Sequence, residues 1–296
     1  MSSKPTIGFI GLGIMGMAMA KNTQAKGYPV LVTNRSEGRR KEAKSEGLSV
    51  LSTPKEIADQ SDAIVIMVTD SSGVQDVLKG PGGILQGEVR NKTVIQMSTI
   101  DEPSTLKFSI QAEEAGLYFL DCPVAGSKKQ VEAGQLVILA GGDPEILEKW
   151  NGPLMAMGKA IVHAGGIGKG TALKLCMNLI VSQMTTALCE SVALAKVQKI
   201  SPEAIFDVIR ESPAINCGYF QIKEKPILED NFKPAFSLEN MLKDVRFMDE
   251  AAKHHRLALP VTQAVRFLME AARTEGFGKE DLISIKKVLT PKISQN

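Results

Sequence analysis

The sequence predicts an α/β fold in its first half, built on a doubly wound and mostly parallel sheet, followed by an all-α second half. Two observations support this prediction. Up to about residue 163, short apolar runs alternate with helical stretches, as in sheets that helices cover on both faces. After about residue 165 the pattern is helical, and no convincing strand follows. We therefore expect a first domain at residues 1–165 and an all-helical domain at residues 166–296, which begins with a long helix.

Seven strands are expected in the first domain, because each apolar run is short and bounded by polar or turn residues. They span residues 6–10, 30–33, 64–68, 93–97, 118–120, 136–140 and 160–163. Helices fill the intervals: one covers about residues 14–26, one starts at Thr53-Pro54 and one starts at Asp101. Further helices are expected at residues 170–197, 202–211, 238–254, 261–274 and about 280–289.

A glycine-rich turn follows the first strand directly. It reads Gly11-Leu12-Gly13-Ile14-Met15-Gly16 and lies between a strand and a helix, which makes it a G-x-G-x-x-G motif of Rossmann type. Gly11 permits the turn, Gly13 leaves room for a pyrophosphate, and Gly16 lets the helix pack closely on the strand. The first N–H groups of the helix favour bound phosphate. The motif predicts dinucleotide binding; the alternative is a glycine-rich turn that merely packs well.

The end of the second strand indicates which dinucleotide binds. It reads Asn34-Arg35-Ser36, without the acidic residue that would bind the adenine ribose of NAD. Asn34 can bond a ribose hydroxyl, Arg35 offers a planar cationic fork for a 2′-phosphate, and Ser36 adds a hydroxyl. We therefore expect NADP(H) rather than NAD. Arg39 and Arg40 add positive charge nearby, or they only decorate the solvated face of the next helix.

The composition argues against several classes of protein. A formal net charge of +2 over 296 residues suggests neither a nucleic-acid-binding protein nor a membrane-surface protein. The four cysteines form no C-x-x-C pair and the three histidines fit no metal-ligand spacing, so we expect reduced thiols and no metal site. Residues 1–5 lead straight into the first strand and leave no room for a targeting segment, so we expect a cytoplasmic protein.

The helix at residues 170–197 carries a lysine at the start of a long uncharged stretch. No charged residue lies between Lys174 and Glu190. This stretch is shorter than the roughly 20 apolar residues that span a bilayer, so we expect a buried helix between domains or subunits. Gly170, Lys174 and Asn178 lie four residues apart and share one face. A buried lysine is costly unless it is paired or functional; alternatively, Lys174 reaches solvent near the start of the helix.

Polar residues also follow three other predicted strands. Ligands bind at the carboxyl ends of the strands in parallel sheets. Three strand ends are therefore candidate regions for the ligand site: Val68-Thr69-Asp70, Met97-Ser98-Thr99 and Asp121-Cys122-Pro123. Of these, Val68, Thr69, Asp70 and Thr99 are the candidates for contact with the dinucleotide.

Three longer motifs follow the glycine-rich turn in a fixed order. They are Asp121-Cys122-Pro123-Val124-Ala125-Gly126-Ser127 with Glu132-Ala133-Gly134-Gln135-Leu136, then Gly168-Lys169-Gly170-Thr171-Ala172-Leu173-Lys174 with Asn178, and finally Leu242-Lys243-Asp244. With these motifs the chain resembles, over essentially its whole length, the β-hydroxyacid dehydrogenase family. That family includes 3-hydroxyisobutyrate dehydrogenase and the glyoxylate, succinic semialdehyde and tartronate semialdehyde reductases.

The resemblance implies roles for individual residues. Lys174 matches the family's catalytic lysine, which stabilises charge on the carbonyl oxygen and donates the proton when an aldehyde is reduced. Asn178 would bind the substrate or hold the lysine. The positions that the resemblance assigns to the substrate are Thr99, Gly126, Ser127, Phe236 and Asp244. Lys243 and Thr99 would contact the cofactor. For Phe236 and Asp244 the alternative is that they are ordinary core and helix residues.

The resemblance implies an NADPH-dependent reductase of small aldehyde acids, most similar to the glyoxylate and succinic semialdehyde reductases, and a homodimer or homotetramer. The alternatives are a 3-hydroxyisobutyrate dehydrogenase, which usually prefers NAD, and a tartronate semialdehyde reductase. A non-enzymatic, dehydrogenase-like oligomerisation module is a further alternative, but such a module lacks the lysine found here at Lys174. One position departs from the family: Ala125 stands where relatives usually have a serine that helps to hold the substrate carboxylate.

Overall fold

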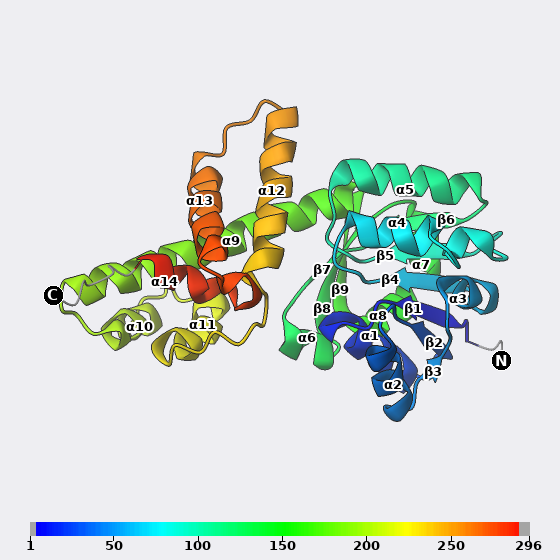
Figure 1. The fold of residues 1–296 in the computed structure, drawn as a ribbon, viewed down its shortest axis with the longest axis horizontal. Coiled ribbons are helices and arrows are strands. Elements are labelled where there is room, and N and C mark those ends of the chain that lie inside the picture. Colours follow the sequence, from blue (N-terminus) through cyan, green and yellow to red (C-terminus); the bar gives the residue numbers. More distant parts are fainter. Residues whose placement is uncertain (1–3, 290–296) are drawn as a thin grey trace. The chain divides into compact units, whose positions relative to one another are not determined.

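The computed structural model describes residues 4–289, and the chain divides into two compact units, residues 1–174 and 175–296. The first unit is α/β and the second is helical, which confirms the predicted fold class (Figure 1). Helix α9 (Lys169–Val197) begins in the first unit and continues into the second. The domain boundary expected after residue 165 stays a prediction.

The described part of the first unit contains a nine-stranded sheet. Its strands are β1 (Ile7–Ile10), β2 (Val30–Thr33), β3 (Ser49–Val50), β4 (Ala63–Ile66), β5 (Thr93–Gln96), β6 (Tyr118–Asp121), β7 (Val124–Ala125), β8 (Leu136–Gly141) and β9 (Gly158–Gly165). Six strands are parallel, in the order β3-β2-β1-β4-β5-β6. Strand β8 then pairs with β6 in the antiparallel sense, and β7 and β9 pair with β8. Because β1 lies between β2 and β4, the glycine-rich turn follows the strand at which the order reverses, where such sheets bind ligands.

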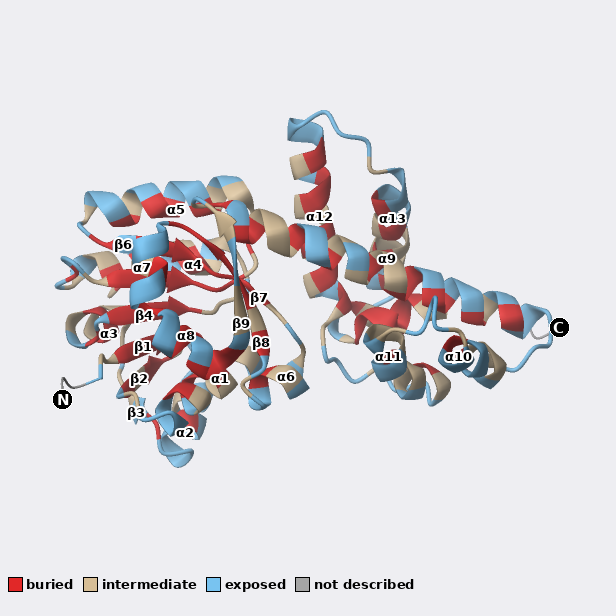
Figure 2. Cartoon of the chain, turned by 180° about the vertical axis from the view of Figure 1, so that it is seen from behind, coloured by how far each residue is buried: buried red, intermediate tan, exposed pale blue. Residues whose placement is uncertain are grey.

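Helices cover both faces of this sheet. They are α1 (Ile14–Ala25), α2 (Glu37–Ser45), α3 (Pro54–Gln60), α4 (Ser71–Lys79), α5 (Glu102–Glu114), α6 (Lys128–Glu132), α7 (Pro144–Lys149) and α8 (Asn151–Met157), with the 3₁₀ helix η1 (Ile84–Gln86). Successive side chains of a strand point to opposite faces. Phe9 accordingly joins one core with residues of α1, α2, α7 and α8, whereas Ile10 joins another with residues of α3, α4 and α5. Figure 2 shows the buried strands between helices with exposed outer faces.

The helix starts expected from capping residues are confirmed. The Thr53 hydroxyl oxygen accepts the Glu56 N–H at 3.2 Å, and the Glu56 carboxylate accepts the Thr53 N–H at 3.2 Å, so α3 begins with a capping box. The Asp101 carboxylate accepts the Ser104 N–H at 2.8 Å at the start of α5. All seven expected strands are present. Strands β3 and β7 were not predicted, because two residues are too few to show an alternating pattern.

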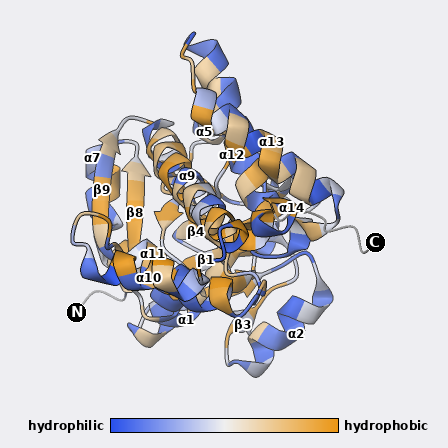
Figure 3. Cartoon of the chain, turned by 90° about the vertical axis from the view of Figure 1, so that its left-hand side faces the viewer, coloured by the Kyte–Doolittle hydropathy of each residue, from blue (hydrophilic) through white to orange (hydrophobic). Residues whose placement is uncertain are grey.

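Helix α9 is only partly buried. By length and composition it could cross a membrane, but the core helix of a soluble protein passes the same test. Of its most apolar window, 39% is buried within the described chain, and Met177, Ile180, Leu194 and Val197 are exposed. Figure 3, coloured by hydropathy, shows hydrophobic residues along α9. Part of α9 is exposed in the single chain, and its expected burial between domains or subunits stays a prediction. The homodimer or homotetramer and the cytoplasmic location stay predictions.

The second unit continues with helices alone, apart from one isolated bridge between Ser237 and Asp281 in the described residues. The elements after α9 are α10 (Pro202–Glu211), α11 (Gly218–Leu228), α12 (Leu238–His254), α13 (Pro260–Thr274), η2 (Phe277–Lys279), η3 (Leu282–Ile285) and α14 (Lys286–Leu289). Helix α11 was not predicted. The single helix expected at about 280–289 is wrong: Asp281 has extended backbone and caps η3 by accepting the Ile283 N–H, so two short helical segments follow it.

A buried ion pair anchors the last part of the second unit. Lys223 of α11 lies 2.7 Å from the carboxylate of Asp281, and both residues are buried. The same carboxylate accepts the N–H groups of Ala235 and Phe236 at 3.0 and 3.3 Å. A buried charge is tolerated when it is paired and its remaining hydrogen-bonding positions are filled. Asp281 therefore fixes the segment that leads into α12.

Removing one partner of this pair should strongly destabilise the protein. Lys223→Ala leaves the Asp281 carboxylate buried without its cation, and we expect a loss of about 3–5 kcal/mol. The matched control is Lys225→Ala on the same helix, because Lys225 forms an exposed pair with Glu229 and such pairs contribute about 0–1 kcal/mol. Urea unfolding of both variants measures the difference. Equal stability of the two variants would contradict this account of Asp281.

Candidate active site

The glycine-rich turn brings three backbone segments into close contact. Gly11 has a φ of +101°, and a Cβ atom on it would lie 2.1 Å from the carbonyl oxygen of Met67. A Cβ atom on Gly16 would lie 1.9 Å from the carbonyl oxygen of Gly11. A Cβ atom on Gly13, in contrast, would meet nothing within 4 Å. Close packing therefore requires glycine at 11 and 16, whereas Gly13 leaves open space beside the turn.

The N-terminus of α1 adjoins this open space. Its N-cap residue, Gly13, makes no side-chain hydrogen bond, and the first turn contains no acidic residue. Backbone N–H groups at such a helix start carry partial positive charge and bind phosphate. The turn from Gly11 to Gly16 therefore fits the pyrophosphate of a dinucleotide.

Asn34, at the end of β2, holds the glycine-rich turn in place. Its Oδ1 accepts the Leu12 N–H at 2.9 Å, and its Nδ2 donates to the Ser36 hydroxyl at 2.9 Å. The sequence predicted that Asn34 bonds a ribose hydroxyl. This contact stays a prediction; in the structure the Asn34 amide joins the β1–α1 turn to the residues after β2. Arg35, next to it, is exposed.

The two arginines that begin α2 have different environments. Arg39 forms an exposed ion pair with Glu42 at 2.7 Å, as expected for a solvated helix face. Arg40 is half-buried, and its Nη1 donates to the carbonyl oxygens of Asn34 and Arg35 at 2.6 and 3.3 Å. Arg40 therefore shapes the backbone that presents Arg35, a role that sequence reasoning did not predict.

The predicted residues after β4 and β5 lie at the same edge of the sheet as the glycine-rich turn, because β1, β4 and β5 are neighbours. Ser98 joins the two strand ends, since its hydroxyl oxygen accepts the Val68 N–H at 2.9 Å. Asp70 caps α4 by accepting a first-turn N–H at 2.8 Å. Thr69 is exposed and Thr99 is half-buried. The edge thus presents backbone and hydroxyl groups next to the proposed pyrophosphate site.

The turn predicted to hold a substrate carboxylate has internal partners. Gly126 has a φ of +149°, and a Cβ atom on it would lie 2.6 Å from the Leu136 side chain. Ser127 donates both its N–H, at 2.9 Å, and its hydroxyl to the Oε1 atom of Gln130. The Gln130 Oε1 atom therefore occupies the position at which a substrate carboxylate oxygen is expected to accept these two hydrogen bonds. Gln130 was not predicted, although the Ser-x-x-Gln spacing of a capping box signals this contact.

Asp121, the last residue of β6, is fully buried. Its Oδ2 accepts the Thr171 N–H at 2.8 Å, and its Oδ1 accepts the Thr171 hydroxyl at 2.7 Å. Burial raises the pKa of Asp121 to about 6, although the hydrogen bonds from Thr171 oppose this shift. The sequence placed Asp121 at a strand end, but this contact with the first turn of α9 was not predicted.

Lys174 lies on α9 one turn after Thr171 and is half-buried. The sequence left open whether Lys174 is buried or reaches solvent, and in the structure the residue is partly buried and partly exposed. Asn178 follows one turn later on the same helix and is buried. The predicted common face of Gly170, Lys174 and Asn178 is confirmed, because all three lie on one continuous helix.

The second unit brings together three predicted residues. Asn178 donates from Nδ2 to Asp244 Oδ2 at 2.7 Å, and Lys243 lies 2.9 Å from Asp244 Oδ1. Asp244 is buried, so it orients the amide and the ammonium group rather than lining open space. Phe236 is half-buried on the segment fixed by Asp281. In residues 4–289, no group of three or more His, Cys, Asp or Glu side chains could hold a metal ion.

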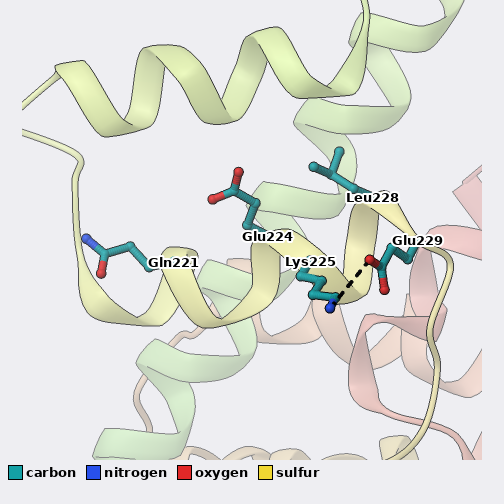
Figure 4. A pocket seen from close by; sticks show the side chains of 5 residues that line it. All are labelled: Gln221, Glu224, Lys225, Leu228 and Glu229. Atoms are coloured by element: carbon teal, nitrogen blue, oxygen red, sulfur yellow. Dashed lines mark ion pairs between the residues drawn. The ribbon is translucent and has the colours of Figure 1, made fainter.

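A hollow of about 200 Å³ on α11 contains none of the predicted site residues. It is lined by Gln221, Glu224, Lys225, Leu228 and Glu229. Figure 4 shows these side chains along the helix, with an ion pair between Lys225 and Glu229. The charged side chains of the hollow are engaged in surface ion pairs, Lys225 with Glu229 and Glu224 with Arg210. The predicted site therefore lies elsewhere in the chain.

Two family models together match almost all of the described chain. The first describes the NAD-binding domain of 6-phosphogluconate dehydrogenase and matches residues 6–166. The second describes the NAD-binding domain of NADP-dependent 3-hydroxyisobutyrate dehydrogenase and matches residues 168–289. The first match contains the glycine-rich turn, and the second contains Lys174, Asn178 and Asp244.

Characterised relatives align over nearly the whole chain. Glyoxylate/succinic semialdehyde reductase 1 of Arabidopsis thaliana is 32% identical over 94% of this chain and 96% of its own. The 2-(hydroxymethyl)glutarate dehydrogenase of Eubacterium barkeri is 32% identical over 95% of this chain and 94% of its own. Among solved structures, 3-hydroxyisobutyrate dehydrogenase of Mycobacterium tuberculosis, described with L-serine, has a TM-score of 0.87 and 25% identity. It covers 97% of this chain and 100% of its own.

The pKa of Asp121 predicts how stability changes with pH. The folded-state pKa of about 6 exceeds the ordinary value of 3.8, so the folded protein holds this proton more tightly than the unfolded chain does. This tighter proton binding adds to the free energy of unfolding. The added free energy is fully present below pH 3.8 and is lost as the pH rises through 6. At about 1.36 kcal/mol per pKa unit, the loss approaches about 3 kcal/mol at pH 7.

Asp121→Asn removes this titration while preserving the shape of the side chain. Between pH 4 and pH 7, wild type should therefore lose about 2.4 kcal/mol more stability than the variant. Urea unfolding followed by fluorescence of Trp150, the single tryptophan, which is buried in the first unit, measures this difference. If the free energies of unfolding of the two proteins changed equally between pH 4 and pH 7, the raised pKa of Asp121 would be wrong.

Proposed function

This chain belongs to the β-hydroxyacid dehydrogenase family, of the 3-hydroxyisobutyrate dehydrogenase type, and we propose that it is an NADPH-dependent reductase of small aldehyde acids. Membership makes it an NAD(P)-dependent oxidoreductase, and the family acts on small hydroxy or aldehyde acids. Glyoxylate and succinic semialdehyde are the proposed substrates, because they are named for a relative that is 32% identical. One observation carries the proposal: Lys174 lies on the helix whose first turn is fixed to the ligand-binding edge of the sheet.

Lys174 is the proposed proton donor. A bound nicotinamide supplies the hydride to the aldehyde carbon, and negative charge then develops on the carbonyl oxygen. The Lys174 ammonium group would stabilise this charge and donate its proton to the oxygen. In the oxidative direction the neutral amine would accept the proton. The half-burial of Lys174 is compatible with both tasks, because the residue is neither fully enclosed nor fully exposed.

Asn178 is the proposed partner of Lys174 on α9. Its Nδ2 donates to Asp244, which fixes the amide and directs the amide oxygen away from that carboxylate. An oriented amide can hydrogen-bond the substrate or the lysine. Asp244 also holds Lys243 through its other oxygen, and Lys243 is the proposed cofactor contact of the second unit. The buried carboxylate of Asp244 thereby connects Asn178, in the motif on α9, to Lys243, in the motif on α12.

Gly126 and Ser127 are proposed to bind the substrate carboxylate. Ser127 presents an N–H and an O–H to one oxygen acceptor, which is the pattern that a carboxylate oxygen requires. Binding would transfer these two donors from Gln130 to the substrate. Ala125 cannot add the hydroxyl that relatives place at this position, so the neighbouring turn would carry this interaction alone. Thr99 would complete the substrate site from the end of β5.

NADP is the proposed cofactor. Arg35 is exposed at the end of β2, in a segment, Asn34-Arg35-Ser36, that contains no acidic side chain, and the nearby Glu37 is paired with Lys41. Arg40 shapes the backbone on which Arg35 stands, and Asn34 joins that backbone to the glycine-rich turn. The alternative activities, 3-hydroxyisobutyrate dehydrogenase and tartronate semialdehyde reductase, use the same lysine. A non-enzymatic module is disfavoured by Lys174 itself.

The proposed activity is tested by initial rates of the purified protein with NADPH and NADH. Glyoxylate, succinic semialdehyde, tartronate semialdehyde and methylmalonate semialdehyde are the substrates to compare. Lys174→Ala should lower kcat about 10²–10⁴-fold, because it removes the general acid. Lys169→Ala on the same helix is the matched control, since its ammonium group pairs with Glu102 at the surface. If Lys174→Ala were as active as wild type, the mechanism would be wrong.

The cofactor preference is tested by Arg35→Ala. Loss of a charge-assisted hydrogen bond costs about 1.5–3 kcal/mol, so the Kd for NADPH should rise roughly 10- to 100-fold while the Kd for NADH stays nearly constant. Lys41→Ala on α2 is the control for a general loss of positive charge, because Lys41 forms an exposed pair with Glu37. An unchanged ratio of the two dissociation constants refutes the role of Arg35.

A further inference from the structure

One buried carboxylate holds the first turn of α9. Both oxygens of Asp121 accept from Thr171, one from its N–H and one from its hydroxyl. Asp121 is fully buried and Thr171 is 1% exposed, so water does not compete for either bond. A carboxylate beside the first N–H groups of a helix also interacts favourably with the helix dipole. The contact is therefore strong and has a defined direction.

Backbone packing limits where this turn can lie. A Cβ atom on Gly170 would lie 2.3 Å from the carbonyl oxygen of Asp121 and 2.4 Å from that of Leu139. A Cβ atom on Gly141 would lie 2.6 Å from the carbonyl oxygen of Gly166. The start of α9 thus rests directly on the ends of β6 and β8. The glycines allow this approach, and the Thr171 side chain ties the helix to Asp121 at the end of β6.

The cluster around Thr171 can satisfy its hydrogen bonds whether or not Asp121 is ionised. The Thr171 hydroxyl lies 3.1 Å from the Thr105 hydroxyl, which in turn lies 3.0 Å from the carbonyl oxygen of Asp101. When Asp121 is ionised, Thr171 donates to it. When Asp121 is protonated, it can donate to Thr171, Thr171 to Thr105, and Thr105 to that carbonyl oxygen. The anchor is therefore maintained in both states.

Lys174 depends directly on this anchor. It lies three residues after Thr171, and residues three apart stand on the same side of a helix, joined by the helical hydrogen bonds between them. A rotation or a shift of the first turn therefore displaces Lys174. An error of about 1 Å in the position of a catalytic group can cost about 10²-fold in rate.

We propose that Asp121 and Thr171 are positioning residues of the active site: the carboxylate fixes the first turn of α9 against the sheet and thereby sets the position of the Lys174 ammonium group. The inference rests on the proposed function of Lys174. Neither residue is assigned a contact with the substrate or the cofactor. They affect the reaction by setting the position of Lys174.

Thr171→Val tests this inference, because it removes the hydroxyl and preserves the size of the side chain. We expect kcat to fall about 10- to 100-fold with an unchanged KM for NADPH, because the glycine-rich turn is not altered. Thr171→Ser, which restores the hydroxyl, should recover most of kcat. Thr23→Val is the matched control, since Thr23 is also fully buried in a helix but its hydroxyl bonds only to the carbonyl oxygen of Met19.

Asp121 is tested by a second pair of variants. Asp121→Asn keeps a hydrogen-bonding atom at both carboxylate positions and should retain much of kcat, whereas Asp121→Ala should behave as Thr171→Val does. Hydrogen exchange gives a readout independent of activity. Amides 169–174 should exchange faster in Thr171→Val and in Asp121→Ala, but not in Thr23→Val.

The outcomes separate this inference from the proposed function. If Lys174→Ala abolishes turnover but Thr171→Val keeps wild-type kcat and wild-type exchange, the positioning role is wrong and the proposed function stands. If wild type reduces none of the aldehyde acids, or if Lys174→Ala is fully active, the proposed function fails and the positioning role fails with it. Equal losses of kcat in Thr171→Val and Thr171→Ser would also overturn the inference, because they would show that the hydroxyl group does not position Lys174.

Discussion

At the carboxyl edge of the sheet, backbone segments of the first unit approach one another so closely that there is no room for a Cβ atom. The rest of the first unit depends on this close packing. Gly16 approaches Gly11 in the glycine-rich turn, and Gly170 approaches the ends of β6 and β8. In both places a helix begins directly on strand ends, so its first N–H groups point toward the edge where ligands bind. One helix start fits a pyrophosphate, and the other leads to Lys174. The same constraint therefore positions both halves of the proposed chemistry.

Buried carboxylates complete what close backbone packing begins. Asp121 holds the start of α9, Asp244 holds Asn178 and Lys243, and Asp281 holds the segment that carries Phe236. Burying a charge is costly unless donors surround it, and each of these carboxylates accepts from groups that are distant in the sequence. Each one thereby fixes a segment that bears a predicted site residue. The three aspartates thus fix the segments that carry the predicted site residues.

The sequence allowed the fold and the main motifs to be predicted, because these depend on local patterns. Apolar runs located the seven main strands, and the hydroxyl of Thr53 located a helix start. Contacts between distant residues were not predictable in this way. Nothing in the local sequence shows that Asp121 meets Thr171, 50 positions later, or that Asn178 meets Asp244, 66 positions later. The apolar sequence of α9 likewise does not show which surface covers that helix, because a helix face buried by another domain and one buried by another subunit have the same composition.

Cofactor choice illustrates why such distant contacts matter for function. The sequence identifies Arg35 by its charge and its place after β2, but charge alone does not orient a guanidinium group toward a phosphate. Arg40 donates to the carbonyl oxygens of Asn34 and Arg35, which flank the Cα atom of Arg35, and Asn34 ties this loop to the Leu12 N–H. The loop that would meet the 2′-phosphate and the turn that would meet the pyrophosphate are thus one hydrogen-bonded unit. In the proposed function, NADP is therefore recognised at two points whose relative position is fixed before binding, which lowers the entropy lost when the cofactor binds.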